Sequence, residues 1–428
     1  MDVPNNLRTF AGETIQLSTF KLSTLYTMKM MWMIIFFVLP LLGLGYALWH
    51  IWQVLPFHNA WRWAAVCASI TLFLCMFVMF SGTIEKMPLN MASIVYETGT
   101  SVIFILLYLV MIFLLLDLGR LVHLIPKAWL FSNGYTSIGI LALMLAIFWY
   151  GNIHYYNKAR EAIDIKTDKM ISLSNDSIKD ASSRNHPIKI VLMSDLHLGY
   201  HNRKAEFRRW VDMINAEKPD LILIGGDIID ISVRPLLEEN VAEEFHRLKA
   251  PIYACLGNHE YYSGEPKAQQ FYKDAGIHLL RDSVARIGNS NDENGKMGNL
   301  VIIGRDDRTN LHRKSIAEII AKANASQSEN GSASRKTIDS KKDFIILLDH
   351  QPYHLEEAEK NGIDFQFSGH THHGQVWPIS WITDAIYEDS FGPLQKGKTQ
   401  YYVSSGMGIW GGKFRIGTRS EYVVLTIK

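Results

Sequence analysis

The feature that most constrains this sequence is a block of four long apolar runs within its first 153 residues. The runs lie near 30–52, 61–80, 101–121 and 135–153. Each holds about 20 residues, which is enough to cross the hydrocarbon core of a bilayer as a helix. Tryptophan and tyrosine stand at the ends of the runs, as is typical of helices that end at a membrane interface. We therefore predict an all-α bundle of four transmembrane helices, the alternative being buried helices of a large soluble domain.

The first run is unlike a cleaved signal peptide. Roughly 29 mostly polar residues precede it, and no small-residue cleavage site follows it. Pro40, Gly43 and Gly45 lie inside the run and favour a kinked helix. We predict a tail over 1–29, the four helices over 30–153, a polar linker over 154–186 and a second domain over 187–428.

The positive charges beside the apolar runs indicate an orientation. Lysine and arginine are more frequent in the N-terminal tail, the second loop and the segment after the fourth run than in the first and third loops. Because cytoplasmic flanks carry the excess of positive charge, both termini and the second domain are expected in the cytoplasm of a multi-pass inner or plasma membrane protein. Glu85 and Glu97 are expected in a loop, and Asp117 near a helix end.

Charge and cysteine content exclude several classes of protein. The formal net charge of the 428 residues is +1, so no overall field favours nucleic acid. The chain has three cysteines, without the spacing of a disulfide framework. We expect neither a disulfide-stapled secreted fold nor a nucleic-acid partner.

The second half of the chain alternates strand and helix patterns. Short runs rich in Ile, Leu and Val, such as "IKIVLMSD", "DLILIGGD" and "DFIILLDH", are typical of buried strands. Amphipathic segments such as "AEFRRWVDMINAEK" and "EENVAEEFHRLK" lie between them and predict helices. This alternation predicts an α/β domain.

Polar side chains stand where five of these strands end. Because the carboxyl ends of strands in an open α/β sheet meet at one edge, these side chains are expected to lie close together. They are Asp195, His197, Asp227, Asn258, His259, His350, His370 and His372.

Carboxylate, amide and imidazole donors without thiolate suit Mn²⁺, Fe, Zn²⁺ or Mg²⁺. A set of this size has too many donors for one ion that keeps open positions. They suit two divalent ions about 3.5–4 Å apart that share a carboxylate, an arrangement used on phosphate esters.

The motifs "SDLHLG", "GGDIID", "GNHE", "LLDH" and "GHTH" resemble, in order and spacing, those of the calcineurin-like metallophosphoesterases. The resemblance covers about 187–428, and the C-terminal tail is similar to a bacterial, membrane-associated branch of that family. It implies a four-layer β-sandwich flanked by helices. The chain departs from that branch at His373, where glycine is usual.

The resemblance also implies a role for each donor. Asp195, His197 and His372 would bind the first metal, and Asn258, His350 and His370 the second, with Asp227 bridging the two. His259 would act beside the leaving group, and Asp230 would orient it, although a helix N-cap is an alternative role for Asp230. Glu260 would support the site from behind, and His373 would lie at its rim. Mn²⁺ is the metal that we favour.

The function expected from these residues is hydrolysis of a phosphomonoester, phosphodiester or pyrophosphate bond. A hydroxide activated by two cations would attack phosphorus in line, and His259 would protonate the leaving group. The membrane segment makes a lipid-linked phosphate a plausible substrate, with membrane lipids as neighbours. An alternative is a transport or signalling protein with a regulatory phosphoesterase-like module. The filled ligand positions favour the enzyme.

Overall fold

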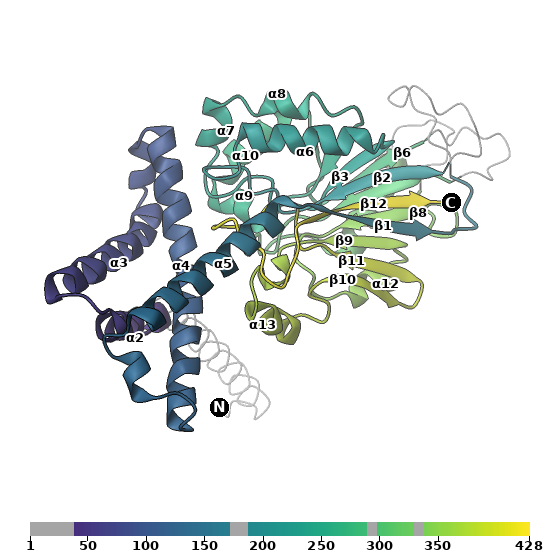
Figure 1. Ribbon diagram of the computed structural model, residues 1–428. Coiled ribbons are helices and arrows are strands. Elements are labelled where there is room, and N and C mark those ends of the chain that lie inside the picture. The colour runs from purple at the N-terminus through teal and green to yellow at the C-terminus, as the bar shows by residue number, and fades with distance from the viewer. Residues whose placement is uncertain (1–37, 172–186, 289–297, 329–336) are drawn as a thin grey trace, which may run out of the picture. The chain divides into compact units, whose positions relative to one another are not determined.

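The computed structural model describes residues 38–171, 187–288, 298–328 and 337–428 (Figure 1). The chain divides into two compact units. The first comprises residues Met1–Phe77 and Ser101–Leu145, and the second comprises Val78–Thr100 and Ala146–Lys428. Helices α3, α4 and α5 each contribute residues to both units.

Three of the described helices are long and apolar enough to cross a membrane: α3 (Asn59–Phe80), α4 (Leu89–Leu121) and α5 (Gly134–Tyr156). They correspond to three of the four predicted spans. The remaining predicted span, 30–52, lies partly in α2 (Leu39–Val54). Residues 1–37 lie outside the described part of the chain. The short helices η2 (Thr83–Lys86) and η3 (Lys127–Leu130) lie in connections.

Helix α4 begins 12 residues earlier than the apolar run predicted. It has 33 residues and includes Glu97, so the expectation of a loop at Glu97 was wrong. Pro88 precedes the helix, and no proline interrupts the segment from Leu89 to Ser101. The polar residues of this first part therefore continue the helix, because only proline or a strong cap would end it there.

The first unit has a small apolar core. Ala47 of α2, Phe73 of α3 and Phe113 of α4 are buried in it. Asp117 accepts a hydrogen bond from the hydroxyl of Tyr46 (2.8 Å) and lies 3.0 Å from Nε2 of His50. The carboxylate is therefore paired with side chains of α2 rather than left unpaired in apolar surroundings.

The second unit is built on two six-stranded sheets. One has the order β1-β12-β2-β3-β4-β5, parallel except where β12 meets β2, and the other has the order β10-β11-β9-β8-β7-β6, antiparallel at its outer pairs. The strands of the first sheet are β1 (Ala159–Ile165), β12 (Glu421–Ile427), β2 (Ile188–Met193), β3 (Leu221–Ile224), β4 (Ile252–Ala254) and β5 (His278–Leu279). Those of the second are β10 (Gly392–Lys396), β11 (Thr399–Val403), β9 (Phe365–Ser368), β8 (Phe344–Leu348), β7 (Leu300–Gly304) and β6 (Ser283–Ile287).

The two sheets pack face to face, with helices outside them (Figure 1). Ile190 and Leu192 of β2 join Ile346 of β8 in the core between the sheets. Val191 and Met193, the alternate residues of β2, face the helices on the outer side. Because both faces of β2 are buried, its sequence is a continuous apolar run instead of an alternating one. The predicted α/β β-sandwich flanked by helices is confirmed.

Helices cover the outer faces of both sheets. The helices that follow strands of the first sheet are α6 (Lys204–Ala216), α7 (Arg234–Glu238), α8 (Ala242–Phe245), α9 (Asn258–Tyr262) and α10 (Glu265–Asp274). Those of the second are α11 (Ile316–Ser328), α12 (Glu356–Lys360), η4 (His372–Gly374) and α13 (Ile379–Ile386). The single helix expected from "EENVAEEFHRLK" is instead interrupted between α7 and α8, where Asn240 has φ of 51°.

Strand β1 lies in the segment that we expected to be a linker. It pairs in parallel with β12 through seven residues and so extends the first sheet. Its alternation of exposed and half-buried residues is typical of an edge strand rather than of a buried one. Residues 172–186 of the expected linker lie outside the described part of the chain.

Candidate metal centre

The structure brings the predicted donors together at the carboxyl ends of the central strands. Asp195 and His197 follow β2, and Asp227 follows β3. Asn258 and His259 begin helix α9 after β4. The remaining donors follow β8 and β9 of the second sheet: His350, His370 and His372. Both sheets therefore supply side chains to one place, as the sequence predicted.

The backbone that carries these donors is strained. A positive φ is uncommon outside glycine and costs about 1 kcal/mol or more per residue. It persists where the surrounding structure enforces it, as at functional sites. Five of the seven predicted metal ligands have one: Asp195 (53°), His197 (44°), Asp227 (52°), His370 (71°) and His372 (49°).

Two glycines allow the loops to approach one another. A Cβ on Gly369, in "GHTH", would lie 2.2 Å from a carboxylate oxygen of Asp195. A Cβ on Gly257, in "GNHE", would lie 2.1 Å from a carboxylate oxygen of Asp227. These motifs therefore need glycine beside their donors, because any side chain would displace a carboxylate.

Three donors form the first group: Asp195, His197 and His372. The Nε2 atoms of His197 and His372 lie 3.0 Å apart. A carboxylate oxygen of Asp195 lies 3.5 Å from Nε2 of His372 and 3.9 Å from Nε2 of His197. Two ring nitrogens that converge beside a buried carboxylate suit a cation between them.

Asp227, His350 and His370 form the second group. Nδ1 of His350 donates to the carbonyl of Gly225 (2.7 Å), which turns the buried Nε2 atom toward Asp227. Nδ1 of His370 lies 2.8 Å from the amide oxygen of Asn258, so Asn258 adjoins this group.

Asp227 lies between the two groups. Its Oδ2 atom is 3.1 Å from Nε2 of His350 and 3.7 Å from Nε2 of His197. Its Oδ1 atom accepts a hydrogen bond from the backbone N–H of His259 (2.9 Å). One carboxylate oxygen therefore faces donors of both groups at once.

Burial and charge set the protonation of these groups. Burial lowers the pKa of His370 to about 4 and holds the pKa of His372 well below its ordinary value. Burial would raise the pKa of Asp227, but His350 and His259 outweigh it and keep that pKa well below its usual range. Burial would lower the pKa of His350, but the carboxylates of Asp227 and Asp195 outweigh it and raise that pKa well above its ordinary value. Neutral imidazoles and an ionised carboxylate are the forms that bind metal, so His370, His372 and Asp227 fit divalent ions, and metal binding at His350 would release a proton.

Asp230 contacts three histidines. Its Oδ1 atom lies 3.4 Å from Nδ1 of His197 and 3.3 Å from Nδ1 of His259, and its Oδ2 atom lies 3.6 Å from Nδ1 of His201. Asp230 does not cap a helix, since α7 begins at Arg234 with Val233 at its N-cap. The alternative role as an N-cap was therefore wrong, because the carboxylate is turned toward the histidines.

His259 has the charge environment of a proton donor. Burial would lower its pKa, but the carboxylates of Asp227 and Asp230 outweigh burial and raise it to about 9. Because Nδ1 faces Asp230, the second ring nitrogen is left for other partners. The ring also packs edge-on against Tyr262, with centroids 5.2 Å apart.

His373 is separated from the donor groups. Its ring stacks on Phe391 with centroids 4.6 Å apart, and its Nε2 atom lies 3.4 Å from a carboxylate oxygen of Asp384. It is absent from the groups of converging donors among the described residues. This placement agrees with the expectation of a residue beside the site.

Two buried charged side chains, Glu260 and Arg415, form hydrogen bonds to the backbone of the loops that carry the donors. Glu260 accepts hydrogen bonds from the backbone N–H groups of Asp227, Ile229 and Gly257. Arg415 is fully buried and donates to the carbonyls of His372 (2.7 Å) and Gly408 (3.0 Å).

Sequence reasoning missed Arg415 and the contact of His201 with Asp230. Arg415 lies in "GGKFRIG", where no donor spacing marks it. His201 stands four residues after His197, a proximity that only the turn after β2 explains.

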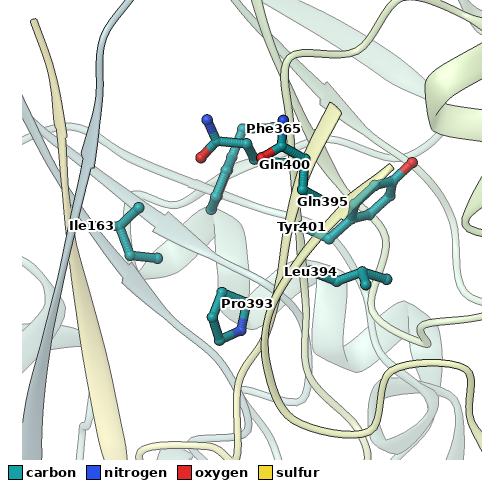
Figure 2. A pocket seen from close by; sticks show the side chains of 7 residues that line it. All are labelled: Ile163, Phe365, Pro393, Leu394, Gln395, Gln400 and Tyr401. Atoms are coloured by element: carbon teal, nitrogen blue, oxygen red, sulfur yellow. The ribbon is translucent and has the colours of Figure 1, made fainter. Parts of the chain in front are cut away.

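A separate pocket lies between β1 and strands β10 and β11 (Figure 2). Apolar and amide side chains line it, with Tyr401 as its one titratable residue. The hydroxyl of Tyr401 donates to the carbonyl of Leu355, so it has a structural partner. The pocket shares no lining residue with the donor groups, and we assign it no function.

Residues 188–374 match the family model of the calcineurin-like phosphoesterases. They form a calcineurin-like phosphoesterase domain. The matched range contains all seven predicted ligands and ends two residues after His372. The phosphoesterase domain is therefore the part of the chain that carries the candidate metal centre, and the expected resemblance is confirmed.

Relatives from bacteria and animals share this domain. An uncharacterized metallophosphoesterase of Campylobacter jejuni is 29% identical over 56% of this chain and 59% of its own length. One of Aquifex aeolicus is 29% identical over 65% of this chain and 95% of its own length. A zebrafish protein named transmembrane protein with metallophosphoesterase domain is 28% identical over 56% of this chain and 53% of its own length.

These findings establish the class of the matched domain. Residues 188–374 are similar to phosphoesterases, which are hydrolases of phosphoric ester bonds. The three apolar helices and the transmembrane relatives indicate membrane association. The match covers little more than half of the length of two of these relatives.

Proposed function

We propose that this protein is a membrane-anchored, dinuclear-metal phosphoesterase that cleaves a phosphomonoester, phosphodiester or pyrophosphate bond in a lipid-linked substrate. One observation carries the proposal. The Oδ2 atom of Asp227 faces His350 of one donor group and His197 of the other. A carboxylate can bind two ions at once, whereas an imidazole nitrogen binds one.

The donors divide between two sites. Asp195, His197 and His372 would hold the first divalent ion. His350, His370 and Asn258 would hold the second, and Asp227 would serve both. Oxygen and nitrogen donors without thiolate favour Mn²⁺, with Fe, Zn²⁺ and Mg²⁺ as alternatives. When bound, the two ions would supply a nucleophile at neutral pH and neutralise charge on the phosphoryl oxygens.

His259 would donate a proton to the leaving oxygen. The carboxylate of Asp230, 3.3 Å from Nδ1 of His259, orients the ring and stabilises its protonated form. A histidine with a pKa of about 9 carries its proton at neutral pH. General acid catalysis of this kind contributes about 10²- to 10⁴-fold to a rate.

The membrane segment supports a substrate that resides in the bilayer. Three apolar helices exceed what anchoring requires, since one span anchors a domain stably. The excess of Lys and Arg in the tail and after the last span supports a cytoplasmic phosphoesterase domain.

A metal-supplemented screen of the purified full-length chain tests the proposal. The chain would be stripped with a chelator, reloaded with Mn²⁺, Zn²⁺ or Mg²⁺, and offered a soluble aryl phosphate, a soluble diester and phosphorylated lipids in nanodiscs. We expect metal-dependent release of phosphate or headgroup, with the lipid preferred over the soluble esters. Absence of hydrolysis with every metal would contradict the proposal. Preference for a soluble ester would contradict only its lipid-linked part.

A further inference from the structure

Helix α13 has its apolar side turned away from the protein. Trp381, Ile382 and Ile386 are 65%, 57% and 58% exposed, whereas Ser380 is buried. A surface helix normally buries its apolar stripe and exposes its polar one. We call the surface formed by Trp381, Ile382 and Ile386 the outer face of α13.

One polar residue of α13 contacts the loop that carries His373. Asp384 pairs with His373 at 3.4 Å and accepts a hydrogen bond from Ser390. The hydroxyl of Thr383 donates to the carbonyl of Ser380 (2.8 Å). Asp384 is itself half-exposed, and the ring of Trp381 packs edge-on against Trp377, with centroids 5.3 Å apart. Ile382 and Ile386 extend the exposed apolar surface beyond this pair.

Hydrogen bonds connect the residue just before α13, through segment 413–416, to the end of the apolar helix α5. The backbone N–H of Trp377, just before α13, donates to the carbonyl of Ile416 (2.7 Å). The neighbouring Arg415 N–H donates to the carbonyl of Gly151 in α5 (2.9 Å). The ring of Phe414 also packs against Phe148 of α5, with centroids 4.7 Å apart. The segment 413–416 therefore joins α13 to the last turns of α5.

Those last turns of α5 expose residues typical of a membrane interface. Trp149, Tyr150 and Ile153 are 70%, 52% and 51% exposed. Tryptophan and tyrosine are enriched where helices leave the hydrocarbon core. The part of α5 that contacts segment 413–416 thus has the composition of a helix end in the headgroup region.

The charge near α13 identifies the kind of contact. Residues 376–391 contain Asp384, Glu388 and Asp389 but no lysine or arginine. Attraction to anionic lipids therefore cannot hold this segment on a membrane, and only burial of apolar surface can. Tryptophan is enriched both in protein interfaces and at bilayer interfaces. The contact of segment 413–416 with the end of α5 favours the bilayer.

We propose that the outer face of α13 inserts into the headgroup region of the bilayer in which α5 is anchored. Since His372 and His373 lie in η4, directly before α13, insertion brings the edge of the metal centre to the lipid surface. The partner that would cover this surface is a neutral lipid bilayer. The consequence for substrate, which rests on the proposed function, is that the phosphate is taken from a lipid at headgroup depth.

An environment-sensitive probe tests insertion without relying on activity. The full-length chain, with Cys67 and Cys75 replaced by alanine and the buried Cys255 retained, would carry Trp381→Cys labelled with a nitrobenzoxadiazole fluorophore in phosphatidylcholine nanodiscs. Met170→Cys is the matched control, because Met170 is 56% exposed and lies beyond the far end of β1. Ile386→Cys provides a second position if the first variant does not fold.

We expect the probe at position 381 to emit at shorter wavelength, to be quenched by doxyl-labelled lipid and to be shielded from iodide, with no change at high salt. The probe at 170 should be quenched by iodide and not by lipid. Iodide quenching at 381 equal to that at 170 would overturn the proposal. A probe that is shielded from iodide but not quenched by lipid would also overturn it, because a protein segment or a second copy would then cover this face.

The effect of insertion on hydrolysis can be measured separately. The variant Trp381→Ser with Ile382→Ser should hydrolyse a lipid phosphate in nanodiscs about tenfold more slowly, since it loses two apolar side chains from the interface. Its hydrolysis of a soluble aryl phosphate should be unchanged. Equal activities on the lipid would contradict a role of insertion in catalysis. A wild-type chain that is inactive on every ester would contradict the proposed function while leaving the probe result intact.

Discussion

At the residue scale, two neighbouring histidines have different surroundings. His372 faces His197 and Asp195 through Nε2, whereas His373 stacks on Phe391 and pairs with Asp384. Both have positive φ and follow the same strand. Their difference in role therefore depends only on where each side chain points, which makes them a matched pair.

His372→Ala should lose one bound metal ion per chain, while His373→Ala should keep both. The first variant removes a donor from the group around Asp195, and the second removes a ring that faces away from it. Metal content of the purified chains, measured by plasma mass spectrometry after Mn²⁺ loading and desalting, checks this. Equal metal content in the two variants would contradict the division of roles.

Asp230→Asn should lower the phosphoesterase rate about 10- to 100-fold and weaken metal binding, because Asp230 orients both His197 and His259. His259→Ala should lower the rate and leave metal content unchanged. Rates at saturating Mn²⁺ and a titration with metal separate the two variants. Unchanged metal affinity in Asp230→Asn would mean that its contact with His197 has no role in ligation.

At the element scale, the loop after β9 depends on a second loop far along the chain. Arg415 donates to the carbonyl of His372 in the first loop and to those of Ser405 and Gly408 in the second. The two loops follow β9 and β11, which pair in the second sheet. The buried guanidinium therefore sets how η4 sits against the rest of the site.

Arg415→Met should lower the free energy of unfolding by about 2 kcal/mol or more, because it leaves several buried carbonyls without donors. It should also weaken metal binding at the group that contains His372. Lys413→Met, which removes a neighbouring cation paired with Glu206, is the control for a general loss of stability. Weakened metal binding in both variants would contradict a specific role of Arg415.

Asp389, in the connection between α13 and β10, should make stability depend on pH. Burial raises its pKa from 3.8 to about 6 in the folded chain. The folded state therefore holds this proton more tightly than the unfolded state, and stability falls as pH rises from about 4 to 6 and then levels off. Because the group is partly solvated, we expect a loss of about 1–2 kcal/mol.

Asp389→Asn should remove this loss. In detergent, its melting temperature should exceed that of the wild type at about pH 8, with a smaller difference at about pH 5. Glu388→Gln is the control, since Glu388 is an exposed neighbour with an ion pair to Lys396. A difference between Asp389→Asn and the wild type that did not vary with pH would contradict the assignment.

The sequence predicted the strands and donors better than the boundaries of helices. β2, β3 and β8 are apolar runs that end in donor residues. The runs predicted strands buried on both faces, and the donors predicted a site at the edge of the sheet. The start of α4 could not be predicted, because its first turns mix apolar residues with Asn90, Ser93 and Glu97 and so interrupt the apolar run. Arg415 and β1 were also missed, since each depends on a partner that is remote in sequence.

At the scale of the whole molecule, the chain combines apolar spans with a two-sheet phosphoesterase domain. Each sheet supplies part of the metal centre: Asp195 and Asp227 come from the first, and His350 and His370 from the second. The site therefore forms only when the sandwich is complete. Partial unfolding of either sheet should release metal before the spans are affected.

If two metal ions share Asp227, both the metal content and the activity of the chain must depend on this one carboxylate. The full-length wild-type chain and Asp227→Asn would be loaded with Mn²⁺, desalted and assayed for bound metal and for phosphoesterase activity. We predict two ions per wild-type chain, loss of metal in Asp227→Asn, and a fall in rate of about 10³-fold. One ion or none per active wild-type chain, or full activity in Asp227→Asn, would contradict the account.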